Sequence, residues 1–295
     1  MRRPHAPGRC ARAGRVRLAV AFLALAGAHG TAFADARPAS TPATGPAPVS
    51  ATAATASSGP TPAATPATTP ATTGIARPKV SLDPYKARYH VSYRGLSGGQ
   101  IESSLRPGTA PGLWLYETRA YPNLLGRVAV SPEARERSSM EISGEGRVRP
   151  LAFDFDDGSA EGGKDVHLAF DWAANRVEGE AAGKPVDLVV TPGTQDTASV
   201  QAAMLVDLLA GREPTGFRIL TGSKLRDYRY WREGPATVVT PYGRFDAVVW
   251  ASQRDGSTRV TKVFHAPALG YVPVQAIQYR KGRVEVLMKL VALER

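Results

Sequence analysis

The chain has 295 residues, and its 37 Lys and Arg outnumber 26 Asp and Glu, giving a formal net charge of +11. Six arginines lie within residues 1–17, so the charge without this segment is +5 (+11 − 6). A charge of this size on a chain this long lacks the concentrated basic surface typical of nucleic-acid binding, so we expect no nucleic-acid partner.

Residues 1–34 have the three parts of a cleavable signal peptide. A basic segment precedes the apolar residues 18–26, and Ala32 and Ala34 then supply the small side chains that signal peptidase recognises. The apolar run is too short for a permanent membrane anchor. We predict cleavage after Ala34, localisation in the periplasm and no transmembrane anchor after cleavage.

Cleavage would remove the single cysteine of the chain. Cys10 precedes the apolar run, so it is not the lipid-accepting cysteine of a lipoprotein. The remaining chain would contain neither disulfides nor cysteine metal sites, and no thiol for catalysis. The fold must therefore depend on its core alone.

Residues 35–78 consist almost wholly of Ala, Thr, Pro, Ser and Gly. Such a composition cannot bury apolar surface, and the spacing of its prolines favours extended conformers. We predict a disordered linker over 35–78, which is either a spacer or a low-complexity insertion without a role. A single β-rich domain is expected over 79–295.

Alternation of apolar and polar residues begins at Tyr85 and predicts a half-buried strand to residue 94. Turn signals such as Asp157-Gly158 and Asp255-Gly256 separate further strand-like runs. These runs are 100–105, 113–120, 134–142, 150–156, 165–172, 186–190, 224–232, 236–240, 244–253, 258–265, 272–279 and 283–293. Thirteen candidate strands at short spacing indicate a mainly β fold, an antiparallel meander curled into a barrel or half-barrel.

One helix is predicted over 197–210, with Asp196 as its N-cap and Gly211 at its end. Apolar residues cover nearly all of its surface, in two rows on opposite sides. A helix of this kind must be covered on most sides, and it is too short to span a bilayer. We expect it to lie in the hollow of the curved sheet.

Motifs that would indicate chemistry have simpler structural explanations. The sequence from Gly95 to Gly99 fits the G-x-S-x-G pattern of serine hydrolases, but a strand-like segment follows it where the nucleophile elbow requires a helix. We interpret it as a glycine-rich hairpin turn. His90, His167 and His265 occupy three different predicted strands without metal-ligand spacing. We therefore assign no catalytic residue and no cofactor.

Two other groups of residues were considered as binding sites. Asp154, Asp156 and Asp157 could hold calcium, but their alternation with phenylalanines indicates the wet face of a strand and its turn, so no metal site is assigned. Basic and aromatic residues alternate along 224–232. We interpret this as a solvated strand face, with contact to anionic glycan or lipid headgroups as the functional alternative.

Several short motifs together resemble a known family of proteobacterial exported proteins, the family called domain of unknown function 3108. The motifs are the segments 89–99, 170–172 followed by Val177, Gln195-Asp196, 240–245, and 271–277 followed by Gly282. The resemblance covers about residues 85–293. It implies an exported or periplasmic protein and supplies no activity and no catalytic residues. The predicted architecture is also similar to that of periplasmic lipoprotein carriers, by analogy only.

These patterns leave three functions open. The first is a non-catalytic periplasmic carrier for an apolar or amphipathic ligand such as a lipid. The second is an envelope assembly factor that binds a protein partner, and the third is an enzyme of unknown type. An open apolar cavity would favour the carrier, and a packed interior would favour the assembly factor. The candidate ligand-binding residues are Val200, Met204, Leu208, Tyr89 and Tyr93.

Overall fold

The computed structural model describes residues 81–295. The predicted signal peptide, its cleavage site and the whole of the linker over 35–78 lie outside the described residues. Within 81–295, no helix is both long and apolar enough to cross a bilayer.

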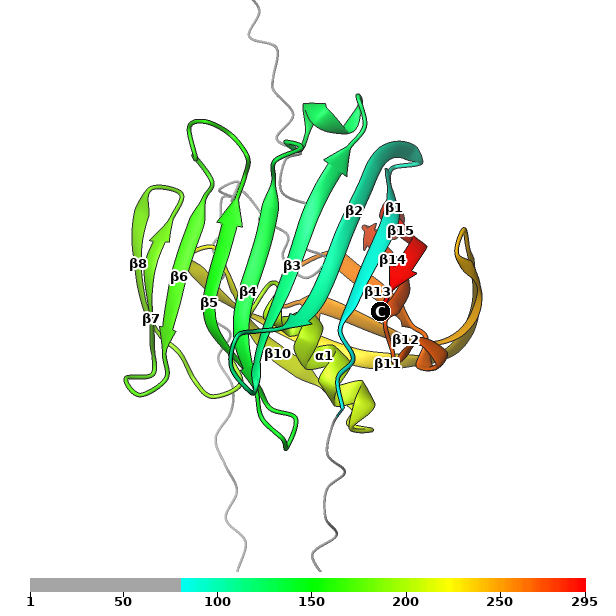
Figure 1. Cartoon of the computed structure of the whole chain (residues 1–295). Helices are drawn as coiled ribbons and strands as arrows, with labels where there is room; N and C mark the ends of the chain where they lie inside the picture. The colour runs from blue at the N-terminus through cyan, green and yellow to red at the C-terminus, as the bar shows by residue number, and fades with distance from the viewer. Residues whose placement is uncertain (1–80) are drawn as a thin grey trace, which may run out of the picture. The chain divides into compact units, whose positions relative to one another are not determined.

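The described chain is mainly β, as predicted, and its strands join in one sheet (Figure 1). The strands are β1 (Tyr85–Tyr93), β2 (Leu96–Pro107), β3 (Leu113–Pro122), β4 (Arg135–Ile142), β5 (Val148–Asp156), β6 (Val166–Asp171), β7 (Arg176–Ala181), β8 (Lys184–Val189), β9 (Gln195–Asp196), β10 (Gly216–Thr221), β11 (Lys224–Thr240), β12 (Gly243–Arg254), β13 (Arg259–His265), β14 (Pro273–Arg280) and β15 (Arg283–Glu294). The helices are α1 (Ser199–Leu209) and the 3-10 turns η1 (Gly126–Val128) and η2 (Pro267–Leu269).

The sheet consists of two runs of consecutive strands, β1 to β8 and β9 to β15. The two runs are joined in the middle of the sheet, where β1 pairs with β15. From one edge to the other the strand order is β8-β7-β6-β5-β4-β3-β2-β1-β15-β14-β13-β12-β11-β10-β9. Every pair is antiparallel except β9 and β10, which are parallel. The first and last strands therefore pair with each other, with Tyr93 opposite Val286 and Ala87 opposite Leu293.

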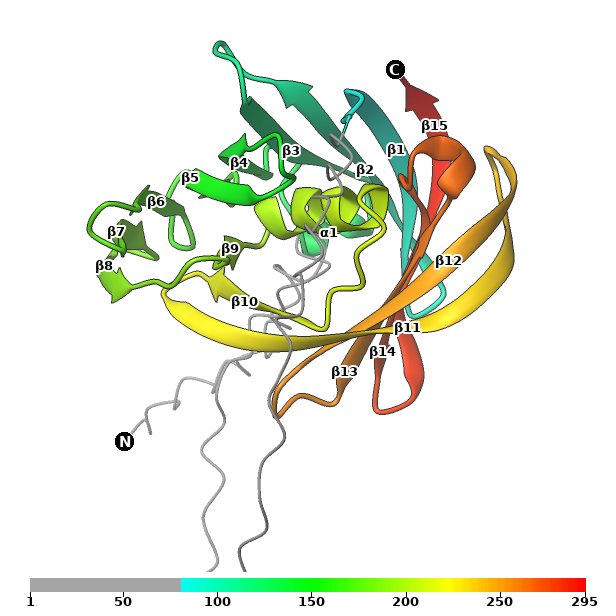
Figure 2. The ribbon, with the colours of Figure 1, turned by 90° about the horizontal axis from the view of Figure 1, so that it is seen from below.

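The two edges of this sheet are close in sequence. Only residues 190–194 separate β8 from β9, which lie at opposite edges. The sheet curls, and β9 lies beside β5, where the Gln195 amide donates to the carbonyl of Val148 at 3.0 Å (Figure 2). No ladder joins β8 to β9, so the sheet is open. Of the two predicted forms, barrel or half-barrel, the barrel is therefore not confirmed.

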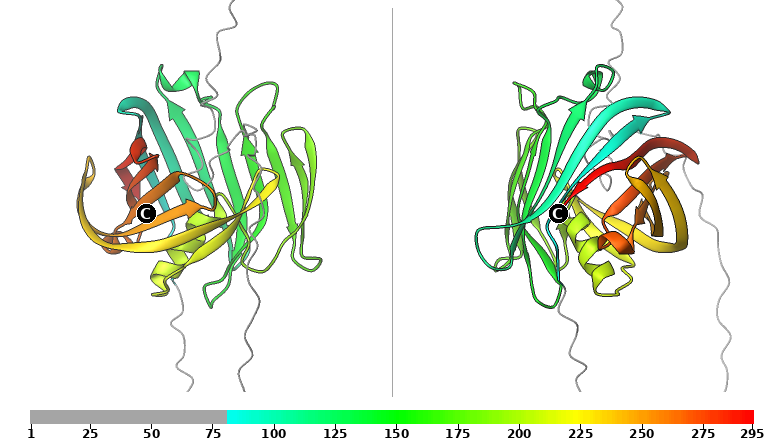
Figure 3. Two further views of the ribbon diagram at one scale, coloured as in Figure 1. Left: turned by 180° about the vertical axis from the view of Figure 1, so that it is seen from behind. Right: turned by 45° about the vertical axis from the view of Figure 1, so that its right-hand side comes forward.

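The helix α1 begins two residues after its predicted start and ends one residue before its predicted end. The Asp196 carboxylate accepts hydrogen bonds from the amides of Ala198 and Ser199, as expected of a capping residue. Gly211 ends the helix in the left-handed conformation, with φ of 67°. The ribbon views place α1 between the two halves of the curled sheet (Figures 1, 2 and 3).

The two sides of α1 pack differently. Ala202, Leu205 and Val206 belong to the main core, together with side chains from most of the strands. On the other side, Val200 packs on Ile219 and Tyr228 in a separate small cluster. Met204 and Leu208 pack on Trp250 in a third cluster. Both sides of the helix are thus buried, as its apolar surface requires.

The predicted strands differ from the observed ones in identifiable ways. The segments 224–232 and 236–240 are one strand, β11, interrupted by a bulge between Arg232 and Gly234. Strands β7, β9 and β10 were not predicted, because β7 is largely polar and β9 has only two residues. The turn expected over 95–99 is shorter, since β2 already begins at Leu96.

Because β15 pairs with β1 in the middle of the sheet, shortening a buried side chain of β15 should strongly lower the unfolding free energy. Leu290 is fully buried opposite Tyr89, so Leu290→Ala should lower the unfolding free energy by about 2–5 kcal/mol. Val284→Ala, on an exposed side chain of the same strand, should cost about 0.5 kcal/mol or less. Urea denaturation monitored by tryptophan fluorescence measures both values. Equal effects of the two substitutions would contradict this account of the core.

Candidate functional site

A buried polar cluster lies where α1 begins. Alternation along β4 directs Glu136, Ser138 and Met140 to the interior, and each is less than 4% exposed. The segment that leads into α1 places Asp196 and Thr197 against the first two of these. Four polar side chains thus meet inside a sheet whose other inward positions are mainly apolar.

Hydrogen bonds satisfy the carboxylates of this cluster. The Ser138 hydroxyl donates to Asp196 Oδ2 at 2.7 Å, and the amides of Ala198 and Ser199 donate to Oδ1 at 2.8 and 2.7 Å. The Thr197 hydroxyl donates to Glu136 Oε1. These contacts tie the N-terminal end of α1 to β4, so this end of the helix is firmly held.

Burial changes the protonation of both acids. It raises the pKa of Asp196 to about 6, although hydrogen bonds with Ser138, Ala198 and Ser199 oppose the rise. It raises the pKa of Glu136 from 4.5 to about 8, with the Asp196 charge adding to the effect. At neutral pH, Glu136 is therefore largely protonated and Asp196 largely ionised, so the cluster holds one negative charge.

A cavity of about 30 Å³ adjoins this cluster between α1 and the sheet. We call it the acidic cavity, and its lining is Tyr89, Ile101, Ser103, Tyr116, Thr118, Glu136, Thr197, Gln201, Val263, Pro273, Gln275, Ala276 and Met288. This volume accommodates a water molecule but not an acyl chain.

A second cavity of about 20 Å³ shares Gln201 and Val263 with the first. We call it the tryptophan cavity, and its lining is Val200, Gln201, Met204, Tyr230, Trp250, Ser252, Thr261, Val263 and His265. The Trp250 side chain is buried, and no group of the described residues accepts a hydrogen bond from its Nε1. Such an unpartnered donor is costly in a protein interior and marks a place where a ligand atom could bind.

His265 gives the tryptophan cavity an acceptor as well. Its Nδ1 lies 2.9 Å from the carbonyl oxygen of Tyr271, so Nδ1 carries the proton and Nε2 has a free lone pair. Burial lowers the pKa of His265 to about 4, which keeps the ring neutral at physiological pH. The cavity lining thus combines apolar side chains with polar ones, among them the unpartnered donor of Trp250 and the acceptor of His265.

The five residues predicted to bind ligand separate into two groups. Val200 and Met204 line the tryptophan cavity, and Tyr89 lines the acidic cavity. The Tyr89 hydroxyl donates to the carbonyl of Pro273 at 3.0 Å. Leu208 packs on Trp250 and Tyr93 reaches Glu285, but neither lines either cavity. Their role in ligand binding stays a prediction.

Sequence reasoning missed Glu136, Trp250 and Gln201. A signal for Glu136 was present, because the alternation over 134–142 puts a carboxylate on the same face as Met140. Glutamate on the inner face of a strand is rare and is often functional. No local signal distinguished Trp250, whose neighbours in the cavity come from α1, β11, β12 and β13.

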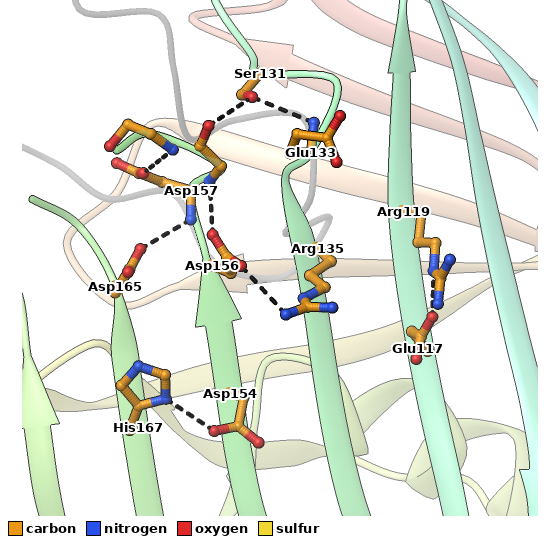
Figure 4. Close-up of polar contacts among 12 residues, drawn as sticks. Glu117, Arg119, Ser131, Glu133, Arg135, Asp154, Asp156, Asp157, Asp165 and His167 are labelled. Atoms are coloured by element: carbon orange, nitrogen blue, oxygen red, sulfur yellow. Dashed lines mark hydrogen bonds and ion pairs between the residues drawn. The ribbon is translucent and has the colours of Figure 1, made fainter. Parts of the chain in front are cut away.

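The aspartates considered for calcium lie at the exposed end of β5 (Figure 4). Asp156, Asp157 and Asp165 form the group that offers clustered ligand atoms, within 4.8 Å of one another, among residues 81–295. Each carboxylate already accepts a backbone amide of this turn, and Arg135 pairs with Asp156 at 3.4 Å. We interpret the group as turn structure.

The isolated histidines are explained by their contacts. His167 pairs with Asp154 on the outside of the sheet (Figure 4). His90 Nε2 lies 3.0 Å from Ser97 Oγ, the serine of the G-x-S-x-G pattern. Ser97 lies at the exposed start of strand β2, and Asn123 also donates to its hydroxyl, so the strained elbow that activates a hydrolase serine is not formed.

The raised pKa of Glu136 makes stability depend on pH. Above pH 4.5 the unfolded chain releases a proton that the folded chain retains up to about pH 8, so the unfolding free energy falls as pH rises. Between pH 6.5 and 8 Asp196 is largely ionised in both states, whereas folding lowers the pKa of His265 from 6.5 to about 4, so His265 partly opposes this fall below about pH 7.5. We expect a fall of up to about 1.4 kcal/mol per pH unit there.

Glu136→Gln keeps an oxygen that accepts the hydrogen bond from Thr197 but removes the ionisable carboxyl group. The variant should therefore show a weaker dependence of unfolding free energy on pH. Thermal unfolding of both proteins at pH 6.5, 7.25 and 8 provides the measurement. An identical slope in the two proteins would show that Glu136 is not the responsible group.

Comparison with solved structures gives weak similarities. A provisionally assigned lipoprotein of Parabacteroides distasonis is 11% identical, with a TM-score of 0.34, and the match covers 72% of this chain and 96% of that one. MucB, in its complex with MucA from Pseudomonas aeruginosa, is 14% identical, with a TM-score of 0.32; the match covers 72% of this chain and about half, 51%, of that one. These values are too low to transfer a function.

Sequence comparison is more informative about the family. No curated protein matches the chain. The profile of the family described as "Protein of unknown function (DUF3108)" matches residues 88–288, which is more than half of the chain and nearly all of the sheet. The resemblance found in the sequence motifs is confirmed, and this chain belongs to the DUF3108 family.

Proposed function

We propose that the chain is a non-catalytic binding module of the cell envelope, and that it holds the apolar part of an amphipathic ligand between α1 and strands β11–β13. The unequal packing of α1 is the observation that carries this proposal. The side with Leu205 and Val206 belongs to the main core, whereas Val200 and Met204 border a cavity and pack in separate clusters.

Polar groups at the same place fit an amphipathic ligand rather than a plain hydrocarbon. Trp250 Nε1 offers a buried donor, and His265 Nε2 offers an acceptor. A ligand hydroxyl could accept from Trp250 Nε1 and donate to His265 Nε2 while its acyl chain replaces the contacts of Met204. Gln201 lies between the two cavities, so a ligand that displaced it would join them.

The ligand cannot enter without movement of the helix. Cavities of about 30 and 20 Å³ are far smaller than the several hundred Å³ of typical small-molecule sites. Opening would pivot α1 about its N-terminal end, which the Asp196 hydrogen bonds hold. The Met204 and Leu208 cluster, nearer the other end, would then separate from Trp250.

A protein-binding assembly factor is the second candidate. It is favoured by the small volume of the cavities, since a packed interior leaves the surface as the place of action. The edge strand β8 has one unpaired side and could add a strand from a partner. This alternative predicts no uptake of an apolar ligand.

Filling the shared space tests ligand uptake. Val263 borders both cavities, so Val263→Leu adds one methylene to that space and should leave stability unchanged within about 1 kcal/mol. Fluorescence titration with an environment-sensitive fatty acid should show saturable binding to the wild type, weakened at least about tenfold in the variant. Val260→Leu, on the same strand and outside both linings, is the matched control.

Two outcomes of this titration would exclude the carrier function. If the wild type takes up no fatty acid or monoacyl lipid, or if Val260→Leu weakens binding as much as Val263→Leu, the carrier function is excluded. The assembly-factor function then becomes the better account.

Because one side of α1 is loosely packed, shortening a side chain on that side should lower the unfolding free energy less than shortening one on the core side. Leu205→Ala removes core contacts and should lower the unfolding free energy by about 3 kcal/mol. Met204→Ala, beside an existing cavity, should cost about 1–2 kcal/mol, because fewer neighbours surround the lost atoms. Urea denaturation of both variants measures the difference. A larger loss from Met204→Ala would mean that this side is core.

A further inference from the structure

Exposed apolar side chains concentrate at one end of the sheet. Among residues 81–295, nine large apolar side chains are exposed, and six of them lie in three segments at this end. They are Leu96, Tyr121, Leu124, Leu125, Val128 and Val284. Leu124 and Val128 are 83% and 88% exposed, so they project into solvent rather than lining a groove.

Strand register brings the three segments together. The β1–β2 turn and the end of β3 meet where Gly99 lies opposite Pro122. On the other side, the Arg94 amide donates to the carbonyl of Glu285 at 2.9 Å, next to the β14–β15 turn. We call residues 93–100, 121–132 and 279–284 the docking end.

The loop that carries η1 is fixed on the β1–β2 hairpin. The Asn123 side chain donates to the carbonyl of Ser97 at 2.9 Å, and its amide donates to the carbonyl of Gly98 at 3.1 Å. Gly126 approaches so closely that a Cβ there would lie 2.0 Å from the Gly98 oxygen. The projecting leucines are thus presented by a packed loop, whose close approach requires glycine.

The docking end is mainly basic, with the exposed Glu133 and the buried Glu285 directly beyond its segments. Its three segments contain five basic residues and no Asp or Glu: Arg94, Arg127, Arg280, Lys281 and Arg283. Arg94 and Arg280 both contact the buried Glu285 at 3.5 Å, and Arg259 contacts it at 3.0 Å. Arg127, Lys281 and Arg283 form no ion pair with a carboxylate of the described residues. The surface is therefore apolar at its tip and positive around it.

We propose that the docking end binds the surface of an anionic lipid bilayer, with Leu124, Leu125 and Val128 inserted among the acyl chains. Basic side chains around the tip would contact lipid phosphates, and Tyr121 would lie at the headgroup level. Projecting Leu and Val residues fit a fluid bilayer, which needs no matching pocket. Protein interfaces instead concentrate binding energy in Trp, Tyr and Arg anchors.

Vesicle binding of protein purified from the envelope fraction tests the proposal. The probe is sedimentation with vesicles of phosphatidylethanolamine and phosphatidylglycerol, with phosphatidylcholine vesicles for comparison. We expect binding to the anionic vesicles. The triple variant Leu124→Ser, Leu125→Ser and Val128→Ser should lower the partition coefficient at least about tenfold. Arg127→Gln should lower it about fivefold on anionic vesicles and little on neutral ones.

The matched control is Val189→Ser with Val239→Ser, two exposed valines that lie outside the docking end. This control carries the same N-terminal residues, so binding by that segment would be equal in both proteins. All altered side chains are exposed, and unchanged melting temperatures will confirm that folding is intact. Val263→Leu should also bind vesicles normally, which separates docking from ligand uptake.

A second measurement places the tip directly in the lipid. Leu124→Trp should shift its emission to shorter wavelength with anionic vesicles and be quenched by brominated acyl chains, whereas Val239→Trp should not. The proposal is overturned if the wild type fails to bind, or if the triple variant and the control bind equally. It is also overturned if the triple variant loses only a cross-link to a protein partner and keeps its vesicle binding.

Discussion

A short connection between the two edges of the sheet constrains the whole domain. Residues 190–194 join β8 to β9, so the ends of these strands are at most about 20 Å apart. A flat sheet of fifteen strands would be roughly 67 Å wide. The sheet must therefore curl until its edges approach, and the next element of the chain, α1, begins inside the hollow. Pairing of β1 with β15 holds the middle of the curl together.

The same constraint explains why the helix has two unlike sides. Its first residues are fixed to β4 by the Asp196 and Thr197 contacts, so one side faces the core between the two halves of the sheet. The other side faces β11 and β12, where Trp250 provides the main contact and small cavities remain. A protonated Glu136 lowers the charge at the fixed end. We connect ligand binding with the loosely packed side and docking with the end of the sheet that carries η1.

Local pattern predicted much of the fold. The alternation in β1 and the helix limits set by Asp196 and Gly211 are properties of short segments, and the structure confirms them. Strand β7 was missed because its polar residues show no alternation of apolar and polar side chains. The bulge at Gly234 was mistaken for a turn between two strands. The open sheet, the meeting of Trp250 with His265 and the three turns of the docking end depend on pairing between distant segments. Pairing of that kind cannot be worked out from the pattern of one segment.

The central claim is that α1 opens on one side while the sheet stays intact. Native-state hydrogen exchange of the backbone amides measures this most directly. The account predicts that amides in the second half of α1, around Met204 to Leu208, exchange through a local opening. The free energy of that opening should be several kcal/mol below that of the amides in β1 and β15. Exchange of the α1 amides only through global unfolding, with the same free energy as β1 and β15, would contradict the account.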